Sequence, residues 1–401
     1  MNLYDYIAWI LIISQVLFTL QLIRNYRYTF TGPKDRCKRY NFRTVLIIPC
    51  RGLDDGFRSN MLSFLRQDYP EYSLRFVVDS KTDPAYSVLA DLVEKHSETS
   101  KACNIKILVA DKASGNSQKI HNLLYAYKSI PENTDIIAFA DSDICAEPDW
   151  LVELVTPLRR TRTAITSGYR WFIPRKNNLA SIMLSVINAK ITQLLGSYRY
   201  NQAWGGTMAM RVDTFRKLGI EKIWSKALSD DLSASMAAKR AKMTIVFVPK
   251  CLVASYETTN LKRLFEFGRR QFVITRIYAF RTWLTGLACM IYSLGGLWGT
   301  LAAAFCLASA GHGRNLYFAV PAVFFVCQFF RAVLRQRIAS VIFRQDLRRL
   351  KIVMAADILF FWMWSIILFG VILFSAAGNT ITWRGIRYRL ISPEETEIIS
   401  S

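Results

Sequence analysis

Four long apolar segments constrain the fold of this chain more than any other feature of its sequence. They cover about residues 6–23, 284–310, 316–334 and 352–376. A helix that crosses the hydrocarbon core of a bilayer needs roughly 20 predominantly apolar residues. We therefore predict one membrane helix before, and about three after, a polar region that carries most of the charge. Core helices of a soluble domain are the alternative interpretation.

The first apolar segment is predicted to be an uncleaved anchor, because no small-residue cleavage site follows it. The basic residues after it place 24–283 in the cytoplasm by the positive-inside rule, and the basic loop 335–351 falls on the same side. The arginines at 383–390 reach that side only if the number of spans is odd. One C-terminal segment is therefore a candidate for a re-entrant or interfacial helix in a multi-pass integral membrane protein. The basic cluster after the first segment comprises Arg24, Arg27, Lys34, Arg36, Lys38 and Arg39.

The formal net charge of +22 raises the question of a nucleic-acid partner. The basic residues concentrate beside the apolar segments, where anionic lipid headgroups attract each lysine or arginine by about 1 kcal/mol. The eight cysteines are scattered without a CxxC pair, which indicates reduced thiols and neither a disulfide framework nor a zinc site. With only three histidines, a histidine-rich metal site is excluded. We expect the lipid bilayer, and no nucleic acid, as a partner; the oligomeric state stays open.

Between the first apolar segment and residue 150, short apolar strands alternate with helical patterns. Strands are expected at 45–49, 74–78, 104–110 and 135–140, with helices near 56–66, 84–96 and 117–129. This alternation predicts a parallel sheet that is buried on both faces and binds ligands at the carboxyl ends of its strands. We therefore expect an α/β domain. Beyond residue 150 the pattern is irregular, with further β-like runs at 163–167 and 244–248.

Two carboxylates separated by one residue follow the strand at 135–140. Asp141 and Asp143 point the same way if the segment is extended, so both can face one ligand. Two like charges this close repel each other unless a cation lies between them. Carboxylate oxygens suit Mg²⁺ or Mn²⁺, which completes its coordination with phosphate oxygens of a substrate. A plain acidic turn is the alternative.

Three further acids stand at positions where a site is expected. Asp79 directly follows the second strand, where a nucleotide base would bind. Asp230 and Asp231 precede a helical pattern, where the helix dipole by itself favours acidic residues. In a cleft, the same pair offers an ionised base beside a carboxyl group of raised pKa.

A lysine at a helix start and a Trp-Gly-Gly sequence add to the candidate site. Ser117 is the expected N-cap, and Lys119 lies in the first turn, where the dipole disfavours a cation unless phosphate binds nearby. Trp204 offers an aromatic face to a sugar or an acyl chain. Gly205 and Gly206 permit close backbone approach, and a structural turn explains them equally well.

The segment 261–283 is basic, rich in aromatic residues and placed directly before an apolar segment. This pattern predicts an amphipathic interfacial helix. Arg270 and Gln271 on that helix can also reach a diphosphate.

The order of these motifs resembles that of the processive and lipid-directed inverting glycosyltransferases of family 2, and most closely the ceramide glucosyltransferase group and its bacterial relatives. The resemblance spans about residues 42–285 through PCRGLDD, RQDYP, VVDSKTDPA, NSQKIHNL, DSDI, WGGTMAMR and SDD. It implies a GT-A (Rossmann-like) α/β domain with one N-terminal and about three C-terminal transmembrane helices. The expected parts are an anchor with its basic segment at 1–40, a cytoplasmic catalytic domain at 41–257, an interfacial segment at 258–283 and a transmembrane region with a tail at 284–401.

The resemblance also implies a role for each acid. Asp79 would contact the uridine of a UDP-sugar, Asp141 would lie near the ribose and the metal, and Asp143 would be the ligand of Mg²⁺ or Mn²⁺. Asp231 would be the base that deprotonates the acceptor hydroxyl, although the family often has Glu-Asp where this chain has Asp230-Asp231. Asp230 and the Trp-Gly-Gly sequence would form the acceptor and sugar pocket.

One family motif is incomplete in this chain. The motif is Gln or Arg, two further residues, then Arg-Trp; Arg270 matches its first position, but Val273 and Ile274 replace Arg-Trp. The departure leaves the diphosphate contact unassigned, with Arg270, Gln271 and Arg276 as candidates.

We therefore expect a membrane-bound enzyme that transfers a sugar, glucose by the resemblance, from a UDP-sugar to a lipid hydroxyl, with ceramide as the acceptor. Another lipid acceptor (a hopanoid, a carotenoid or a diacylglycerol) is an alternative. A polysaccharide synthase is another, although three C-terminal spans are few for a channel unless the chain oligomerises. A non-catalytic, membrane-tethered nucleotide-sugar-binding protein is the alternative from a different class; the missing Arg-Trp favours it and the intact acids oppose it.

Overall fold

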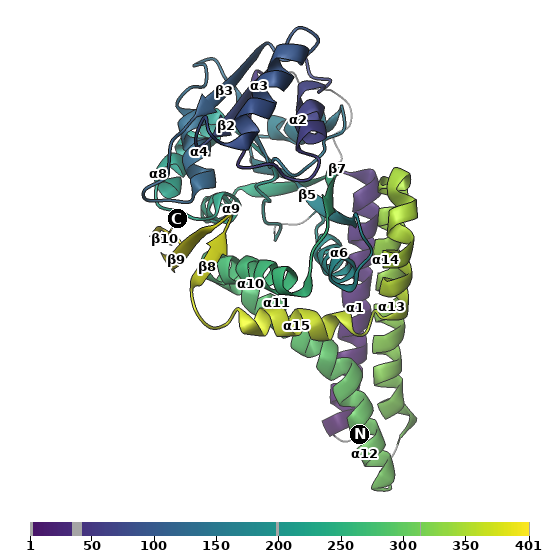
Figure 1. Cartoon of the computed structure of the whole chain (residues 1–401). Coiled ribbons are helices and arrows are strands. Elements are labelled where there is room, and N and C mark those ends of the chain that lie inside the picture. Colours follow the sequence, from purple (N-terminus) through teal and green to yellow (C-terminus); the bar gives the residue numbers. More distant parts are fainter. Residues whose placement is uncertain (1–2, 34–41, 198–199, 313, 401) are drawn as a thin grey trace.

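A seven-stranded mixed sheet lies at the centre of the polar domain, in the order β3-β2-β1-β4-β6-β5-β7 (Figure 1). The computed structural model describes residues 3–33, 42–197, 200–312 and 314–400, and the basic residues 34–39 lie outside these ranges. The four predicted parallel strands are confirmed to within two residues at either end. They are β1 (Thr44–Pro49), β2 (Tyr72–Val78), β3 (Asn104–Val109) and β4 (Ile136–Ala140).

Three longer or antiparallel strands complete the sheet. They are β5 (Thr163–Pro174), β6 (Thr207–Arg211) and β7 (Thr244–Glu257). β6 runs antiparallel to both β4 and β5, whereas β5 and β7 are parallel to each other. The predicted runs at 163–167 and 244–248 are only the first halves of β5 and β7, which continue past a register shift towards the membrane helices (Figure 1).

Helices cover both faces of the sheet, which is why β1 and β4 consist almost entirely of apolar residues. Leu46 and Ile48 of β1 pack into a core with α2 (Phe57–Leu65), α3 (Pro84–His96), α5 (Trp150–Val155) and the 3₁₀ turn Thr156–Arg159 that follows. Val45 and Ile47 alternate with them and face the opposite core. That core is formed with α4 (Gln118–Tyr127), α7 (Val212–Lys217), α8 (Ile220–Trp224) and α9 (Asp230–Arg240).

The predicted N-cap of α4 is confirmed, and α3 begins with a cap of the same kind. The Ser117 hydroxyl accepts a hydrogen bond from the N–H of Ile120, and the Asp83 carboxylate caps α3 through the N–H of Ala85. Both caps hold a helix start against the carboxyl-terminal edge of the sheet, where the predicted ligand site lies.

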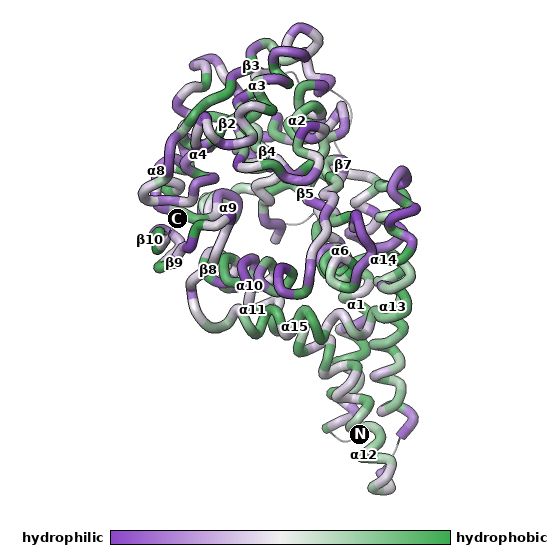
Figure 2. Tube along the Cα trace, in the orientation of Figure 1, coloured by the Kyte–Doolittle hydropathy of each residue, from purple (hydrophilic) through white to green (hydrophobic). Residues whose placement is uncertain are grey.

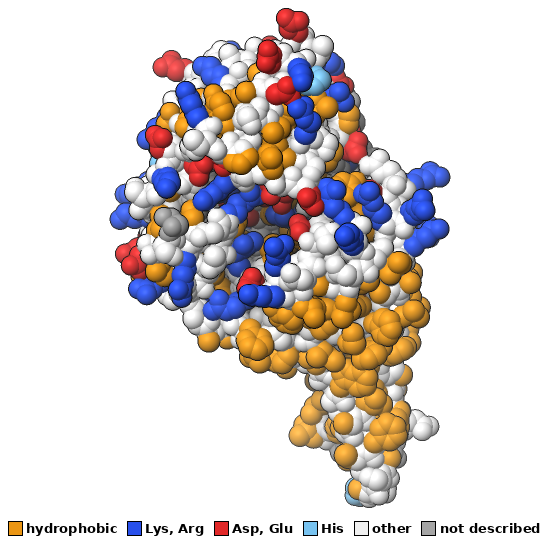
Figure 3. Space-filling model, in the orientation of Figure 1, with side chains coloured by type: hydrophobic (Ala, Val, Ile, Leu, Met, Phe, Trp, Pro, Cys, Tyr) orange, Lys and Arg blue, Asp and Glu red, His pale blue; other side chains and the backbone are white. Residues whose placement is uncertain are grey.

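Three helices of the described chain are long and apolar enough to cross a membrane. They are α1 (Leu3–Thr31), the helix formed by α11 (Phe280–Leu294), a π turn (Gly295–Gly299) and α12 (Thr300–Ser309), and α13 (Asn315–Ile342). They extend away from the sheet (Figure 1) and consist mostly of hydrophobic residues (Figure 2), whose side chains cover the face of these helices seen in Figure 3. The chain therefore has the architecture of a membrane protein.

The last predicted span is broken. A 3₁₀ turn (Arg344–Asp346) leads into α14 (Leu347–Leu359), which meets α15 (Trp364–Phe374) at a bend of 91°. α15 packs against α10 (Leu261–Tyr278) and α11, while α14 packs against α13 and α6 (Leu179–Thr192). The pair is a fourth span only if both helices are counted as one.

The chain ends in a small antiparallel sheet that returns to the polar domain. Its strands are β8 (Thr380–Trp383), β9 (Ile386–Ser392) and β10 (Glu395–Ser400). Arg384, in the β8–β9 turn, donates a hydrogen bond to the carbonyl oxygen of Arg51 and pairs with Asp54. The tail and the polar domain therefore lie on one side of the membrane, which agrees with three crossings and with an α14–α15 pair that does not cross.

Candidate active site

A cavity of about 1010 Å³ lies between the carboxyl-terminal edge of the sheet, α10 and the hairpin formed by β8 and β9, which we call the C-terminal hairpin. In Figure 3 it is the hollow where basic and acidic side chains gather, above the hydrophobic surface of the membrane helices. Eight basic and five acidic side chains line it, so its walls suit an anionic ligand. The basic ones are Arg51, Lys119, Arg170, Arg263, Arg269, Arg270, Arg384 and Arg387; the acidic ones are Asp54, Asp141, Asp143, Glu257 and Glu266.

Asp141 and Asp143 follow β4 and both face the cavity, as their spacing predicts. Arg170 of β5 lies between them, with Nη1 3.0 Å from Asp143 Oδ2 and Nη2 3.4 Å from Asp141 Oδ2. Its guanidinium also lies 4.6 Å from the centre of the Trp204 ring. No sequence signal distinguished Arg170, because only the pairing of β5 with the rest of the sheet brings it to these acids.

The two acids differ in their electrostatic surroundings. Burial opposes ionisation of Asp141, but Lys119 and Arg170 outweigh it and lower the pKa of that carboxyl group. Burial raises the pKa of Asp143, and the repulsion from Asp141 and Asp54 adds to it, with Arg170 offsetting only part. Asp141 is therefore the more firmly ionised of the two.

Lys119 joins two of the predicted acidic groups. Its Nζ lies 2.8 Å from Asp141 Oδ1 and 3.0 Å from Asp230 Oδ2. Burial disfavours the ammonium, but the surrounding carboxylates more than compensate and raise the pKa of Lys119. Burial also raises the pKa of Asp230 to about 6, and Lys119 offsets only part of that effect. The lysine at the helix start thus neutralises carboxylates in this structure.

Asp231 fastens the Trp-Gly-Gly loop to α9. Its Oδ2 accepts a hydrogen bond from the N–H of Gly205 at 2.9 Å, and its Oδ1 accepts from the Ser229 hydroxyl and the N–H of Leu232. The loop is close-packed: a Cβ at Gly205 would lie 2.9 Å from Lys119 Nζ, and still closer to the Asp230 carboxylate. The close approach that the glycines permit is therefore required here.

The predicted site residues fall into two layers. Five of them line the cavity, namely Lys119, Asp141, Asp143, Arg270 and Gln271. The others lie behind lining residues: Asp79 pairs with Arg51 at 3.7 Å, Asp230 with Lys119, and Trp204 lies under Arg170. Gly205, Gly206 and Asp231 belong to the same rear layer through the hydrogen bond of Asp231 to the loop.

The DxD segment fits a divalent cation. The guanidinium of Arg170 between Asp141 and Asp143 shows that both carboxylates can face a single positive group. Asp143 Oδ1 is buried and has no hydrogen-bond partner among the described residues, so one ligand atom is uncommitted. No cluster of three or more His, Cys, Asp or Glu suited to a metal occurs in the described part of the chain. The remaining ligands would therefore come from the substrate.

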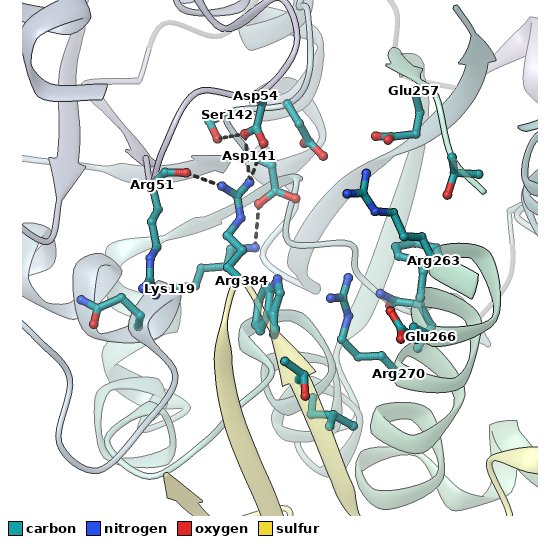
Figure 4. Close-up of a pocket in the computed structure, with 18 of the residues that line it drawn as sticks. Arg51, Asp54, Lys119, Asp141, Ser142, Glu257, Arg263, Glu266, Arg270 and Arg384 are labelled. Carbon is teal, nitrogen blue, oxygen red and sulfur yellow. Dashed lines mark hydrogen bonds and ion pairs between the residues drawn. The ribbon is translucent and has the colours of Figure 1, made fainter. Parts of the chain in front are cut away.

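Residues far apart in the sequence contribute to this cavity (Figure 4). Asp54, in the loop after β1, accepts a hydrogen bond from the Ser142 hydroxyl at 2.9 Å and two from Arg384. Glu257, at the end of β7, has a pKa raised by burial and by the nearby charge of Asp143. No local sequence pattern marks Asp54 or Glu257 as a site residue. For Arg384, the alternation of polar and apolar residues around Arg384-Gly385 predicts a hairpin in the tail.

Comparison with known proteins agrees with this architecture. A model of "Glycosyl transferase family 21" matches residues 7–396. The structure is similar to that of the mannosyltransferase PcManGT from Pyrobaculum calidifontis in complex with GDP-Man and Mn²⁺, with a TM-score of 0.50 at 13% identity over 93% of this chain and 98% of that one. A structure of GalNAc-T7 with UDP, GalNAc and Mn²⁺ matches with a TM-score of 0.43 at 11% identity, over 63% of this chain and 51% of that one.

Proposed function

Because this chain belongs to glycosyl transferase family 21, whose members are ceramide glucosyltransferase-like, we propose that it transfers glucose from UDP-glucose to the hydroxyl of ceramide. That the chain is a glycosyltransferase follows from the family. The donor, the acceptor, the inversion of configuration and the cytoplasmic location of the domain are our proposal.

The observation that carries the proposal is one cavity with two kinds of wall. On one side, the carboxylates of Asp141 and Asp143 and an excess of arginines and lysines suit a metal and a diphosphate. On the other side, apolar residues of β5, α6 and α10 suit an acyl chain; they are Phe172, Leu184, Leu264 and Phe267. α10 contacts α11, the beginning of a membrane helix, so a lipid can present its hydroxyl without leaving the bilayer.

Asp141 and Asp143 would hold Mg²⁺ or Mn²⁺, and Asp79 would contact the uridine beside Arg51. The metal, when bound, neutralises charge on the leaving diphosphate. Lys119 keeps the Asp141 carboxylate ionised and thereby suited to a cation.

Asp231 is the proposed general base. It lies behind the residues that line the cavity, but it is ionisable, partly exposed and oriented by three hydrogen bonds. The ceramide hydroxyl gives its proton to Asp231 as its oxygen forms a bond to the anomeric carbon. The bond from that carbon to the diphosphate oxygen breaks, and UDP leaves with the electron pair. Attack from the face opposite the diphosphate gives a β-linked product from an α-linked donor. Asp230 is less suited to this role because Lys119 neutralises it and it is 3% exposed.

Membranes containing the protein test the proposal. They receive radiolabelled UDP-glucose, UDP-galactose, UDP-N-acetylglucosamine or GDP-mannose, with and without ceramide. We expect label from UDP-glucose to enter the organic phase only with ceramide, and EDTA to prevent it. Asp231→Asn should abolish transfer, while Asp213→Asn, an exposed acid in the first turn of α7, should not.

The outcomes separate the parts of the proposal. Full transfer by Asp231→Asn means that another group is the base. Transfer of a different sugar, or to a different lipid, corrects the substrate and keeps the reaction class. No transfer to any acceptor under any condition favours a nucleotide-sugar-binding protein without catalysis.

A further inference from the structure

The turn at the tip of the C-terminal hairpin has an unusual residue in its first position. Arg384 and Gly385 connect β8 to β9 in two residues, and both have positive φ values of 47° and 84°. Such a turn matches the twist of a hairpin, and its first position favours asparagine, aspartate or glycine. An arginine in this left-handed conformation costs conformational free energy, which indicates that its side chain has a role besides forming the turn.

The hairpin is held firmly against the donor side of the cavity. Ile381, Ile386, Tyr388 and Leu390 are buried in the core that also contains α4 and the end of α10. The Tyr388 hydroxyl accepts a hydrogen bond from the N–H of Gln118, the first residue of α4. On the other side, arginines of α10 donate to carbonyl groups of the strand and of the loop that leads into it; the donors are Arg269 and Arg276, and the acceptors are Ala376, Ala377, Gly378 and Thr380.

This docking explains why α10 lacks the expected Arg-Trp. Val273 is fully buried and Ile274 is 8% exposed, and both pack in the core that seats the hairpin. An arginine and a tryptophan at these two positions would occupy the space of that core and not reach the cavity. The hairpin brings its own Trp383 and Arg384 to the cavity wall instead. Trp383 also lies against Arg270, whose guanidinium is 5.6 Å from the centre of the indole ring.

Arg384 lies next to the carboxylates of the DxD segment. It donates to the Arg51 carbonyl oxygen and to both oxygens of Asp54, which accepts in turn from Ser142, the middle residue of the segment (Figure 4). Arg270 extends into the same space from the opposite wall (Figure 4). A cation held by Asp141 and Asp143 shares its remaining positions with phosphate oxygens, so the diphosphate must come close to this arginine.

We propose that the C-terminal hairpin is part of the donor site and that Arg384 binds the diphosphate of the nucleotide sugar, with Trp383 holding Arg270 beside it. The inference rests on the proposed function, because it needs a nucleoside diphosphate in this cavity. The planar guanidinium pairs with two phosphate oxygens at once and stabilises the charge that develops on the leaving UDP. A merely structural Arg384, which ties the hairpin to the loop after β1, is the competing explanation.

Binding to purified protein in detergent with Mn²⁺ separates the two explanations. Calorimetry gives the dissociation constants of UDP and of uridine for the wild type, Arg384→Gln and Arg384→Lys. We expect Arg384→Gln to weaken UDP binding on the order of 10- to 100-fold and to leave uridine binding unchanged. Arg384→Lys should recover part of the loss, because lysine keeps the charge without the bidentate geometry. Arg389→Gln is the matched control, since Arg389 lies on the same hairpin and pairs with Glu397.

Each outcome decides the question. If Arg384→Gln weakens the binding of UDP and of uridine equally and also lowers the unfolding temperature, then Arg384 only stabilises the structure, and the proposal is overturned. Unchanged UDP binding overturns it as well. If the wild type binds GDP in place of UDP, the comparison is made with GDP and guanosine; a wild type that binds neither diphosphate leaves nothing for Arg384 to hold and refutes it. A wild type that binds UDP but transfers no sugar refutes the proposed function alone, and the variant still tests the diphosphate contact.

Discussion

Replacing Asp230 by asparagine should stabilise the protein at neutral pH, although the substitution removes an ion pair. Asp230 is 3% exposed, and Asp231 and Asp141 lie close enough to repel its charge. Burial and these two carboxylates raise its pKa from 3.8 to about 6, and Lys119 offsets only part of the rise. Lys119 alone does not compensate the negative charges of the three carboxylates that surround it, which belong to Asp141, Asp230 and Asp231.

The magnitude follows from the linkage between the pKa and folding. A carboxyl group whose pKa is raised in the folded state binds its proton more tightly there than in the unfolded chain. Folding stability therefore falls as the pH rises from about 4 to about 6, and it stays low above that range. A rise of about two units corresponds to about 3 kcal/mol at most. Asparagine has no charge whose burial costs free energy. The difference in folding stability between the variant and the wild type should therefore grow through pH 6 and level off near pH 7.

Thermal unfolding of the purified protein in detergent, followed by tryptophan fluorescence in EDTA from about pH 5 to about pH 8, measures this difference. We expect Asp230→Asn to show about half of its full stability advantage over the wild type near pH 5, and to unfold at a temperature several degrees higher at pH 8. Asp213→Asn, at an exposed acid, should show no such pH dependence. A variant that is less stable than the wild type, with a loss that grows with pH, would refute the reasoning and show that the Lys119 ion pair dominates.

Three further predictions concern the site and the membrane region. Gly205→Ala should reduce sugar transfer at least tenfold, because its methyl group would displace the Asp230 carboxylate and Lys119. Gly115→Ala, where the nearest atom lies at 3.8 Å, should transfer normally. Arg335→Leu should destabilise the protein by about 3–5 kcal/mol, because it leaves the fully buried Asp357 without its cationic partner and with only the hydrogen bond from Gln336. Adding Asp357→Leu should restore most of the unfolding temperature, and failure of that rescue would contradict the ion-pair explanation. Asp143→Asn should raise the Mn²⁺ concentration needed for half-maximal transfer at least tenfold; an unchanged requirement would place the metal elsewhere.

The central strands were predictable because their environment is simple. β1, β2 and β4 are covered by helices on both faces, so β1 and β4 are short apolar runs, and β2 is apolar except for Ser73 and the buried Arg75. The second halves of β5 and β7 carry no such signal: a register shift and the approach to the membrane helices change their surroundings along their length. The break between α14 and α15 was also hidden, since an apolar run reveals length but not the 91° bend.

The acidic half of the site was predictable for a similar local reason. Asp141 and Asp143 follow a strand that must be central, and a spacing of two residues puts both carboxylates on one side. The basic half was not. Arg170 reaches the acids through the antiparallel pairing of β5 with β6, and Arg384 reaches Asp54 across 330 residues of sequence.

The sequence by itself determined the elements: the apolar helices, the parallel strands, and the acids at the strand ends, because each is set by neighbours along the chain. Only the tertiary structure decided which cations meet those acids and that the tail returns to the polar domain. The position of Arg384 depends on how Tyr388 and Leu390 pack against the core that also buries Val273 and Ile274. That packing joins segments distant in sequence, and no local pattern records it.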